Sequence, residues 1–505
     1  SLQWHYAMEH YIPKSKPPDP SNIKDFRPIA LLNVEGKLFF SLLSKRLEHH
    51  IINENKFINT SIQKGCMEKV PGCWEHMSMV WSALKEARQN KSTVANIWLD
   101  IANAYGSIPH RLIFFALERY GIDPKWIAII KNYYSALYTK SFSQSAPSSW
   151  HQHFRGIFAG CTLSIILFLC GINIVIEYVL TSKASPVIHS SNIKLPLVRA
   201  FMDDLNLMSS SIPDAQDLLS KCAKALAWAG MTFRADKSRS IIILNGRSVN
   251  SSPFRVEDPT SLTDFSCYIP SIHSSPVRFL GRLIDGTMTD RKAITELEQK
   301  LFSCLKIIDK SSFSGTQKLW FLQHLVVPRI QWSLLIYEVS ITFASLLEKR
   351  IYKYIRKWLK LHSFITTISL YSPLSPCPLP VKPLTAILKS AKISGHLLLR
   401  DSIDPTISST NPKIKVGNWK VDSATSIAEA EMMFQQIQGP RQLGCNGLGI
   451  AKLPPIPEKN TYDCRKLVST TSRAINQEED SQKALQLTLQ CHWMSWENYI
   501  KNNLS

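Results

Sequence analysis

The sequence predicts an α+β fold in which helices cover one face of an antiparallel sheet, followed by a long helical region. The first observation is the order of the segments before residue 290, which is strand, helices, strand, helix, hairpin, helix, strand, strand. This order is typical of an antiparallel sheet with its helices segregated to one side. The second observation is a change of composition, because the chain becomes helical and basic from residue 290 onward.

Composition limits the class of protein. The 505 residues are 45% hydrophobic, so the chain can bury large cores and is not intrinsically disordered. Its formal net charge of +20 favours a polyanionic partner. The 11 cysteines are scattered and form no CxxC pair. They therefore argue against a disulfide framework and favour a reduced, intracellular compartment.

The sequence shows no targeting signal, and we expect no membrane association. Its first residues lack the basic and apolar regions of a signal sequence. The most apolar run, Leu163 to Leu180, is interrupted by Gly171, Asn173 and Glu177, which predicts a buried helix rather than a membrane span. The absence of an initial Met suggests a piece of a longer protein.

Proline positions and hydrophobic periodicity predict the first elements. Five prolines within the first 30 residues indicate an extended segment that runs over a surface. Residues 36–52 have the period of an amphipathic helix, and Leu38, Leu42, Leu43 and Leu47 are expected to face inward. The same reasoning predicts helices at 74–90, 111–120 and 125–137, and a strand at 94–101.

The next elements are short and bounded by turn residues. Two apolar stretches within 197–207 are separated by an Asp-Asp pair, which predicts a β-hairpin. Pro213 and Gly230 bracket a helix over 214–229. The other elements expected here are an extended segment at 148–155, a turn at 156–160, a buried helix at 163–180, and strands at 240–244 and 277–280.

The region after residue 290 contains a basic helix at 345–360. Its cations fall within an arc of about 120° at 100° per residue, and Tyr352 and Tyr354 lie at the edges of that arc. This pattern favours nucleic-acid contact, although a charged face can also be simply solvated. The six cations are Lys349, Arg350, Lys353, Arg356, Lys357 and Lys360. Residues 362–382 are predicted to be a connector.

Three carboxylates form the strongest chemical pattern. Asp100 ends an apolar strand, and Asp203 and Asp204 lie at the tip of the predicted hairpin. Strand ends and hairpin tips can direct carboxylates to one point, where oxygen ligands bind Mg²⁺. An Asp-Asp pair in a loop is often a solvated turn, but the apolar flanks Phe201, Met202 and Leu205 favour burial and a cation.

These residues resemble the motifs of reverse transcriptases. Asp100-Ile-Ala-Asn-Ala-Tyr105 resembles motif A, and Phe201-Met-Asp-Asp204 resembles motif C. The fingers motifs of non-LTR retrotransposons are similar to Arg27-Pro-Ile-Ala-Leu-Leu and Gln63-Lys64-Gly65. Segment 156–164 resembles motif B, Asp236-Lys237-Ser238 resembles motif D, and Arg278-Phe-Leu-Gly281 resembles the primer grip. The motifs stand in the family's order over residues 11–285, and a weaker resemblance reaches about residue 440. The lineage that carries a restriction-like endonuclease is the most similar.

The resemblance implies a right-hand polymerase with fingers, a palm and an α-helical thumb. We expect the N-terminal extension and fingers at 1–93, the palm at 94–285, the thumb at 286–361, and a linker with a C-terminal helical region at 362–505. The implied activity is RNA-directed DNA polymerisation from a DNA primer on an RNA template, with dNTPs and two Mg²⁺ ions, for which Mn²⁺ is a possible substitute. In the family the nicked chromosomal target is the primer, which implies a nuclear site of action.

The family's residue roles are carried over motif by motif. Asp100, Asp203 and the carbonyl of Ile101 would hold metal, and Asp204 would complete the carboxylate cluster. Tyr105 matches the steric gate against a ribose 2′-hydroxyl, unless it is a packed core aromatic. Lys237 would assist the leaving pyrophosphate, unless it is an ordinary surface lysine. The remaining nucleotide-binding residues would be Arg27, Lys37, Ala159 and Gly160. Template and primer contacts would come from Gln63, Lys64, Gly65, Arg278, Phe279, Leu280, Gly281 and the first five cations of the basic helix.

Two departures from the family pattern affect the expected activity. Motif B usually has Gln where this chain has Ala159, and Pro where it has Ile165. A lost hydrogen bond is worth about 0.5–1.5 kcal/mol, which slows incorporation roughly tenfold without abolishing it. Gly106 replaces a second Asp of motif A that is not a metal ligand.

Three alternatives stay open. An RNA-dependent RNA polymerase shares the palm, but Tyr105 argues against ribonucleotide use. Ala159 and the missing modules slightly favour a catalytically weak remnant that only binds RNA, but the intact set of Asp100, Asp203 and Asp204 argues against it. A nuclease acting through the same metals is the least favoured, because nothing in the sequence resembles an endonuclease core. The zinc fingers and the endonuclease expected in a full-length element are not visible in this sequence, which therefore resembles the polymerase core alone.

Overall fold

The structure is a computed structural model, and its described residues form two compact units. These residues are 2–14, 19, 22–68, 70–141, 148–251, 253–257, 266–361, 382–438, 468, 471, 472 and 475. Unit 1 comprises Ser1–Phe279 with Asp285–Thr287, and unit 2 comprises Leu280–Ile284 with Met288–Ser505. Residues 362–381 of the predicted connector lie outside the described residues.

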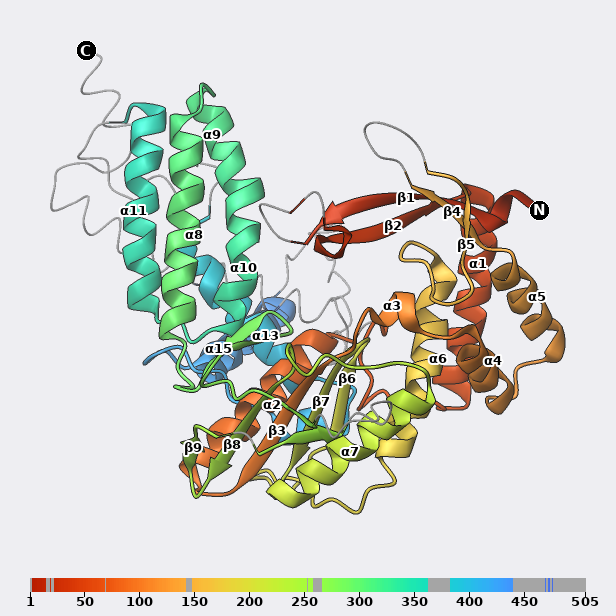
Figure 1. Cartoon of the computed structure of the whole chain (residues 1–505). Helices are drawn as coiled ribbons and strands as arrows, with labels where there is room; N and C mark the ends of the chain where they lie inside the picture. Colours follow the sequence, from red (N-terminus) through yellow and green to blue (C-terminus); the bar gives the residue numbers. More distant parts are fainter. Residues whose placement is uncertain are drawn as a thin grey trace, which may run out of the picture. The chain divides into compact units, whose positions relative to one another are not determined.

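Unit 1 contains a five-stranded antiparallel sheet in the order β6-β7-β3-β8-β9 (Figure 1). The central strand β3 pairs with β7 so that Asp100 lies opposite Asp204. The strands are β3 (Val94–Asp100), β6 (Val198–Phe201), β7 (Asp204–Ser209), β8 (Arg239–Leu244) and β9 (Arg247–Val249). The predicted antiparallel sheet and the 197–207 hairpin are therefore confirmed.

Both faces of this sheet are covered, so the prediction of helices on one face is wrong. Every side chain of β3 from Val94 to Leu99 is buried. Ala95, Ile97 and Leu99 belong to the same core cluster as residues of α6 (Thr162–Val179) and α7 (Ile212–Trp228). Helix α2 (Gly72–Gln89) packs on β6 and β8 instead, and its buried side chains lie outside that cluster.

The N-terminal segment forms strands rather than a simple extended run. A four-stranded sheet has the order β2-β1-β4-β5, in which β1 pairs antiparallel with β2 and parallel with β4. Pro28 is tolerated in β2 because β2 is an edge strand. The strands are β1 (Tyr6–Pro13), β2 (Phe26–Leu32), β4 (Tyr138–Ser141) and β5 (His151–Gln152).

Helix α1 (Val34–Glu48) turns a different face inward from the one predicted. Leu43 and Leu47 are buried as expected, but Leu38 is 70% and Leu42 57% exposed. The buried stripe also contains Gly36 and Phe40. Leu38 and Leu42 each follow one of these residues by two positions, which places them about 200° around the helix.

The remaining elements of unit 1 are short helices and hairpins. Helix α1 continues as η3 (His49–Glu54), and η1 (Leu2–His5) and η2 (Ile23–Asp25) flank β1 and β2. The other helices are α3 (Ala104–Ser107), α4 (His110–Arg119) and α5 (Pro124–Ser135). The other strands are β10 (Arg255–Glu257), β11 (Ser266–Tyr268) and β12 (Val277–Phe279).

Helix α6 is long and apolar enough to span a membrane by length and composition alone. In this structure 72% of its apolar window is buried inside the protein. It contacts α1, α4 and α7. This arrangement matches the predicted buried helix.

Unit 2 is helical in its described part, apart from β13 (Arg282–Ile284). Helices α8, α9, α10 and α11 pack side by side (Figure 1). The helices are α8 (Arg291–Lys310), α9 (Gly315–Phe321), η4 (Leu322–Val326), α10 (Val327–Ile336), α11 (Ile341–Leu359), α13 (Leu384–Arg400), α14 (Pro405–Thr410) and α15 (Val421–Gln438). Helix α13 contacts both α10 and α11, so this C-terminal segment is part of the same unit.

A buried lysine fixes α13 to the end of α10. Lys392 is 1% exposed, and its Nζ donates to the carbonyls of Leu335 and Tyr337 at 2.7 Å each. Burial and the nearby Arg282 lower the pKa of Lys392 to about 7. A neutral amine has two N–H groups, which is enough to make both bonds.

We expect the stability of unit 2 to rise with pH because of Lys392. Its pKa is lower in the folded than in the unfolded chain, so this contribution is present above the unfolded pKa and is lost as the pH falls through about 7. Between about pH 7 and 10 the slope is at most about 1.4 kcal/mol per pH unit. Chemical unfolding at several pH values should show that the free energy of unfolding rises more steeply with pH in the wild-type chain than in Lys392→Met. Equal slopes would contradict the assignment.

Candidate active site

The site is built around a two-residue turn between β6 and β7. Met202 and Asp203 form the turn, and Asp204 begins β7. Met202 has a φ of 56°, a left-handed conformation that is unfavourable for a residue with a long side chain. The antiparallel register places Asp204 opposite Asp100 of β3. The β6–β7 hairpin and the pairing of β7 with β3 together bring carboxylates 103 and 104 positions apart in the sequence to one edge of the sheet.

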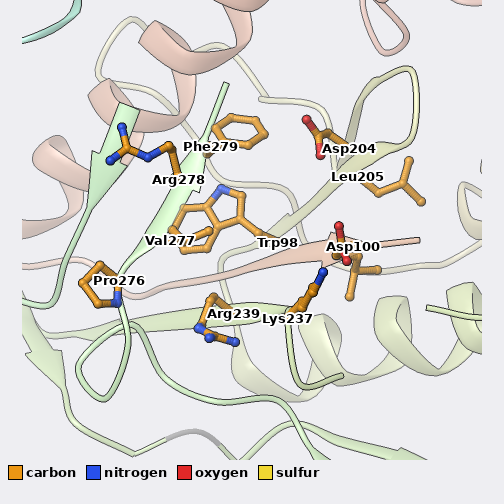
Figure 2. A pocket seen from close by; sticks show the side chains of 11 residues that line it. Trp98, Asp100, Asp204, Leu205, Lys237, Arg239, Pro276, Val277, Arg278 and Phe279 are labelled. Atoms are coloured by element: carbon orange, nitrogen blue, oxygen red, sulfur yellow. The ribbon is translucent and has the colours of Figure 1, made fainter. Parts of the chain in front are cut away.

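Five of the predicted site residues line one pocket of about 260 Å³. Asp100 and Asp204 project into it from β3 and β7, and Lys237, Arg278 and Phe279 lie on its other walls (Figure 2). The pocket thus places two carboxylates beside cationic and aromatic side chains.

The aspartates repel one another. Partial burial, together with the smaller effects of the Asp203 and Asp100 charges, raises the pKa of Asp204 to about 6. Burial and Asp100 also raise the pKa of Asp203, whereas the positive charge of Arg27 opposes this. The turn therefore carries an excess of negative charge, and Arg27 of β2 lies close enough to offset a part of that charge.

The donor set fits a hard divalent cation, with one correction. Carboxylate oxygens are the ligands that Mg²⁺ prefers, and Mg²⁺ is commonly held by one or two carboxylates plus substrate phosphates. No three His, Cys, Asp or Glu side chains lie close enough to hold a metal ion in the described part of the chain. The expected cluster of three converging carboxylates is therefore not formed. Asp100 and Asp203 remain the two candidate ligands, and the carbonyl of Ile101 remains a prediction.

Backbone contacts fasten the motif D loop to Asp100. The N–H of Asp100 donates to Ser238 Oγ at 3.3 Å, and the N–H of Arg234 donates to the carbonyl of Asp100 at 2.8 Å. Lys237 is exposed at the rim of the pocket and directly follows Asp236, which is paired with Arg234. The position of Lys237 is compatible with both its catalytic and its ordinary surface role.

Tyr105 lies beside the aspartates. Its ring stacks on Phe168 of α6, with ring centroids 4.8 Å apart. Burial raises the pKa of its hydroxyl, and the charge of Asp203 adds to the increase. The side chain is only partly buried. It is thus packed on one face and close to the β6–β7 turn, and its role as a gate stays a prediction.

The motif B loop packs on the fingers strand β2. The N–H of Ala30 donates to the carbonyl of Ala159 at 2.8 Å. Gly160 has a φ of 125°, and a Cβ there would lie 2.3 Å from the carbonyl oxygen of Ala30. Ala159 and Gly160 are both exposed. Lys37 is half-buried on α1, and its backbone carbonyl accepts a hydrogen bond from Thr162 Oγ1 at 3.4 Å.

The second fingers motif is buried, which contradicts its predicted contact with the template. Gln63 and Lys64 are 0% and 1% exposed, and Gly65 is also buried. Gln63 bonds to the backbone of Met202, and Lys64 pairs with Glu75 at 2.5 Å. Gln63 therefore holds the β6–β7 turn, whereas Lys64 is bonded to α2 through Glu75.

The remaining predicted contacts belong to unit 2. Leu280 and Gly281 both have positive φ, at 46° and 89°, in the turn that follows β12. On α11, Lys349 and Lys353 are exposed, whereas Arg350 pairs with Glu298, and Lys357 pairs with Asp309 at 2.8 Å.

The aromatic part of the basic helix prediction needs correction. Tyr352 is 2% exposed, and the Arg356 guanidinium lies 4.5 Å from its ring centroid. Tyr352 therefore packs inside the unit and cannot stack on a base. The other edge residue, Tyr354, is partly buried and lies 5.8 Å from the ring of Trp358.

Sequence reasoning gave no role to three residues beside the carboxylates. Trp98 and Arg239 line the pocket, and Ser238 binds the backbone of Asp100. Trp98 precedes Asp100 by two positions, so the two-residue period of a strand could have placed both on one face. No local signal connects Ser238 with Asp100, because 138 positions separate them.

The sheet, the carboxylate turn and the motif order define a polymerase palm, and comparison with known proteins identifies its class. The sequence profile of the family "Reverse transcriptase (RNA-dependent DNA polymerase)" matches residues 12–284, more than half of the chain. The chain belongs to this family. The predicted right-hand polymerase fold and enzyme class are confirmed, and the family implies divalent metal use and binding of a nucleic-acid template and primer.

Among individual proteins, the chain is distantly homologous to Pol polyproteins of R2 non-LTR retrotransposable elements. It is 25% identical over 351 residues to the R2DM Pol polyprotein of Drosophila melanogaster, covering 69% of this chain and 32% of that protein. It is 25% identical over 344 residues to an R2 Pol polyprotein of Popillia japonica, covering 66% of this chain and 44% of that protein. The chain thus spans less than half of each relative's length.

A telomerase from Candida albicans is among the solved structures that are similar to this chain. The TM-score is 0.42 and the identity 12%, over 79% of this chain and 62% of that chain. The family assignment rests on the sequence match.

Proposed function

We propose that this chain is the polymerase part of a non-LTR retrotransposon protein and extends a DNA primer 3′-hydroxyl on an RNA template. The observation that carries the proposal is the paired register of Asp100 and Asp204, with Asp203 at the turn between β6 and β7. In the family's reaction the primer is a nicked chromosomal strand, which would place the protein in the nucleus.

The residues at the site would have different roles in nucleotidyl transfer. Asp100 and Asp203 would hold divalent cations, which would activate the 3′-hydroxyl and stabilise the leaving pyrophosphate. The hydroxyl oxygen bonds to the α-phosphorus of the dNTP as the bond to pyrophosphate breaks. Lys237, at the rim of the pocket, would neutralise charge on the pyrophosphate. Arg278 and Phe279 line the same pocket and would contact the primer end.

Primer extension by the unmodified chain tests the proposal. An RNA template, a labelled DNA primer, dNTPs and Mg²⁺ should give full-length DNA, and omission of any one component should abolish it. Ala159 favours a second candidate, an RNA-binding remnant without useful catalysis. RNA binding with strong salt dependence but no extension, with either Mg²⁺ or Mn²⁺, would support that candidate and overturn the proposal.

Tyr105→Ala should weaken the preference for deoxyribonucleotides. The ring is held against Phe168 beside Asp203, where a ribose 2′-hydroxyl would meet it. We expect the ratio of NTP to dNTP incorporation to rise at least about tenfold, the worth of a single pocket contact. Competition assays with one nucleotide pair measure this ratio. Tyr105→Phe keeps the ring and should keep the wild-type ratio, and an unchanged ratio in Tyr105→Ala would refute the gate.

A further inference from the structure

Gln63 is completely buried beneath the catalytic turn, and its amide is committed to backbone groups. Its Oε1 accepts from the N–H groups of Met202 and Gly65, each at 2.9 Å. Its Nε2 donates to the carbonyl of Met202 at 3.2 Å. Both lone pairs of the amide oxygen are used, and the side chain is 0% exposed. In this arrangement the Gln63 side chain cannot reach a template.

Met202 is the residue that needs such support. Its φ of 56° lies in the left-handed region, which costs a non-glycine residue about 1–3 kcal/mol unless its surroundings hold it. Gln63 binds both the N–H and the carbonyl of Met202. The carbonyl belongs to the peptide that joins Met202 to Asp203, so the orientation of that peptide determines where Asp203 points.

The segment that carries Gln63 is itself firmly held. The N–H of Lys64 donates to the carbonyl of Ala200 at 3.0 Å, and the N–H of Ala200 donates to the carbonyl of Ile62 at 2.8 Å. These bonds extend β6 by a short parallel bridge between Gln63 and Ala200. His76, buried on α2, contacts the same two carbonyls through Nε2 at 2.9 and 3.2 Å. The segment that carries Gln63 is therefore bonded to both β6 and α2.

We propose that Gln63 is a positioning residue that locks the Met202–Asp203 peptide and thereby aims the Asp203 carboxylate. This inference rests on the proposed polymerase function and replaces the template contact expected from the motif. Gln63 acts only through the turn. Its loss should impair the chemical step rather than the binding of template or nucleotide.

Gln63→Met tests this, because Met has a similar length and makes neither type of bond. We expect the rate of single-nucleotide incorporation at saturating dNTP to fall about 10- to 100-fold, the usual effect of displacing a catalytic group by a fraction of an ångström to an ångström. The KM for dNTP and the Kd for RNA should stay within about twofold. A tenfold weaker RNA affinity with an unchanged rate would overturn the proposal in favour of a template contact.

A rescue variant separates positioning from misfolding. Asn tolerates the left-handed conformation better than Met, so Met202→Asn in the Gln63→Met background should recover a part of the lost rate. A merely destabilised core would not be repaired in this way. Equal rates in the wild-type chain and in Gln63→Met would overturn the proposal.

Hydrogen exchange provides a readout that is independent of activity. The amide of Met202 should be protected in the wild-type chain and should exchange at least about tenfold faster in Gln63→Met, because it loses its buried acceptor. If the wild-type chain fails to extend primers but shows this difference, the proposed function fails while the lock on the turn stands. Equal exchange in both proteins would refute the lock itself.

Discussion

Asp203→Asn is expected to reduce RNA-templated primer extension at least about 10³-fold while leaving the fold intact. Asn has nearly the same size and keeps the turn, but it lacks the charge that a divalent cation requires. Losing the several kcal/mol that such a cation contributes to the transition state corresponds to a rate loss of this order. Single-turnover incorporation with Mg²⁺ measures the loss.

A matched control separates the site from general effects of charge. Asp217 lies on α7 with a half-exposed side chain and an i,i+4 contact with Lys221, outside the pocket. Asp217→Asn should therefore extend primers at the wild-type rate. RNA affinity should not fall in either variant, because removing a negative charge cannot weaken attraction to a polyanion. Wild-type extension by Asp203→Asn would exclude a catalytic role for this carboxylate.

Lys64→Met is expected to lower the free energy of unfolding by about 3–5 kcal/mol. Lys64 and Glu75 form an ion pair with side chains 1% and 2% exposed, and the N···O distance is 2.5 Å. Removing one partner leaves an uncompensated charge in the interior, which carries a cost of this size. Denaturant unfolding monitored by circular dichroism measures the change.

The double variant Lys64→Met with Glu75→Leu provides the control. Replacing both partners by apolar side chains removes the buried charge altogether, so most of the lost stability should return. If Lys64→Met is as stable as the wild-type chain but binds RNA more weakly, Lys64 contacts the template as the motif suggested, and its buried placement is wrong.

The sequence predicted the palm well because its signals are local. The strand over Val94–Asp100 is apolar throughout, and the hairpin is marked by the Asp-Asp pair between two apolar runs. A short hairpin fixes its own register, so the placement of Asp203 and Asp204 at one strand end followed from neighbouring residues. The pairing of β7 with β3, which sets Asp204 opposite Asp100, is not local and followed only from the order of the motifs. The order of the motifs then identified the family.

The sheet of β1, β2, β4 and β5 could not be predicted in the same way. Strand β4 pairs with β1 across about 130 positions, and no local pattern specifies a pairing at that distance. The prolines indicated extended backbone in the N-terminal segment but not its partner.

The largest error in the site concerned which way a motif faces. Gln63-Lys64-Gly65 occupies the expected place in the sequence, yet it is buried. Gln63 bonds to Met202, 139 positions away, and Lys64 pairs with Glu75. A similar difficulty affected Tyr352, which packs inside the unit although it lies at the edge of a basic stripe. Periodicity gives relative directions on a helix, but the packing partner decides which direction is inside.

The central claim is that β3 and the β6–β7 turn share a divalent cation through Asp100 and Asp203. Replacing the cation with Fe²⁺ and adding ascorbate and peroxide cuts the backbone next to the metal, and mass spectrometry locates the cuts. We expect cuts near residues 100 and 203 in the same preparation, suppressed by excess Mg²⁺ and absent from Asp203→Asn. Cuts at only one of the two segments, or an unchanged pattern in Asp203→Asn, would contradict the account.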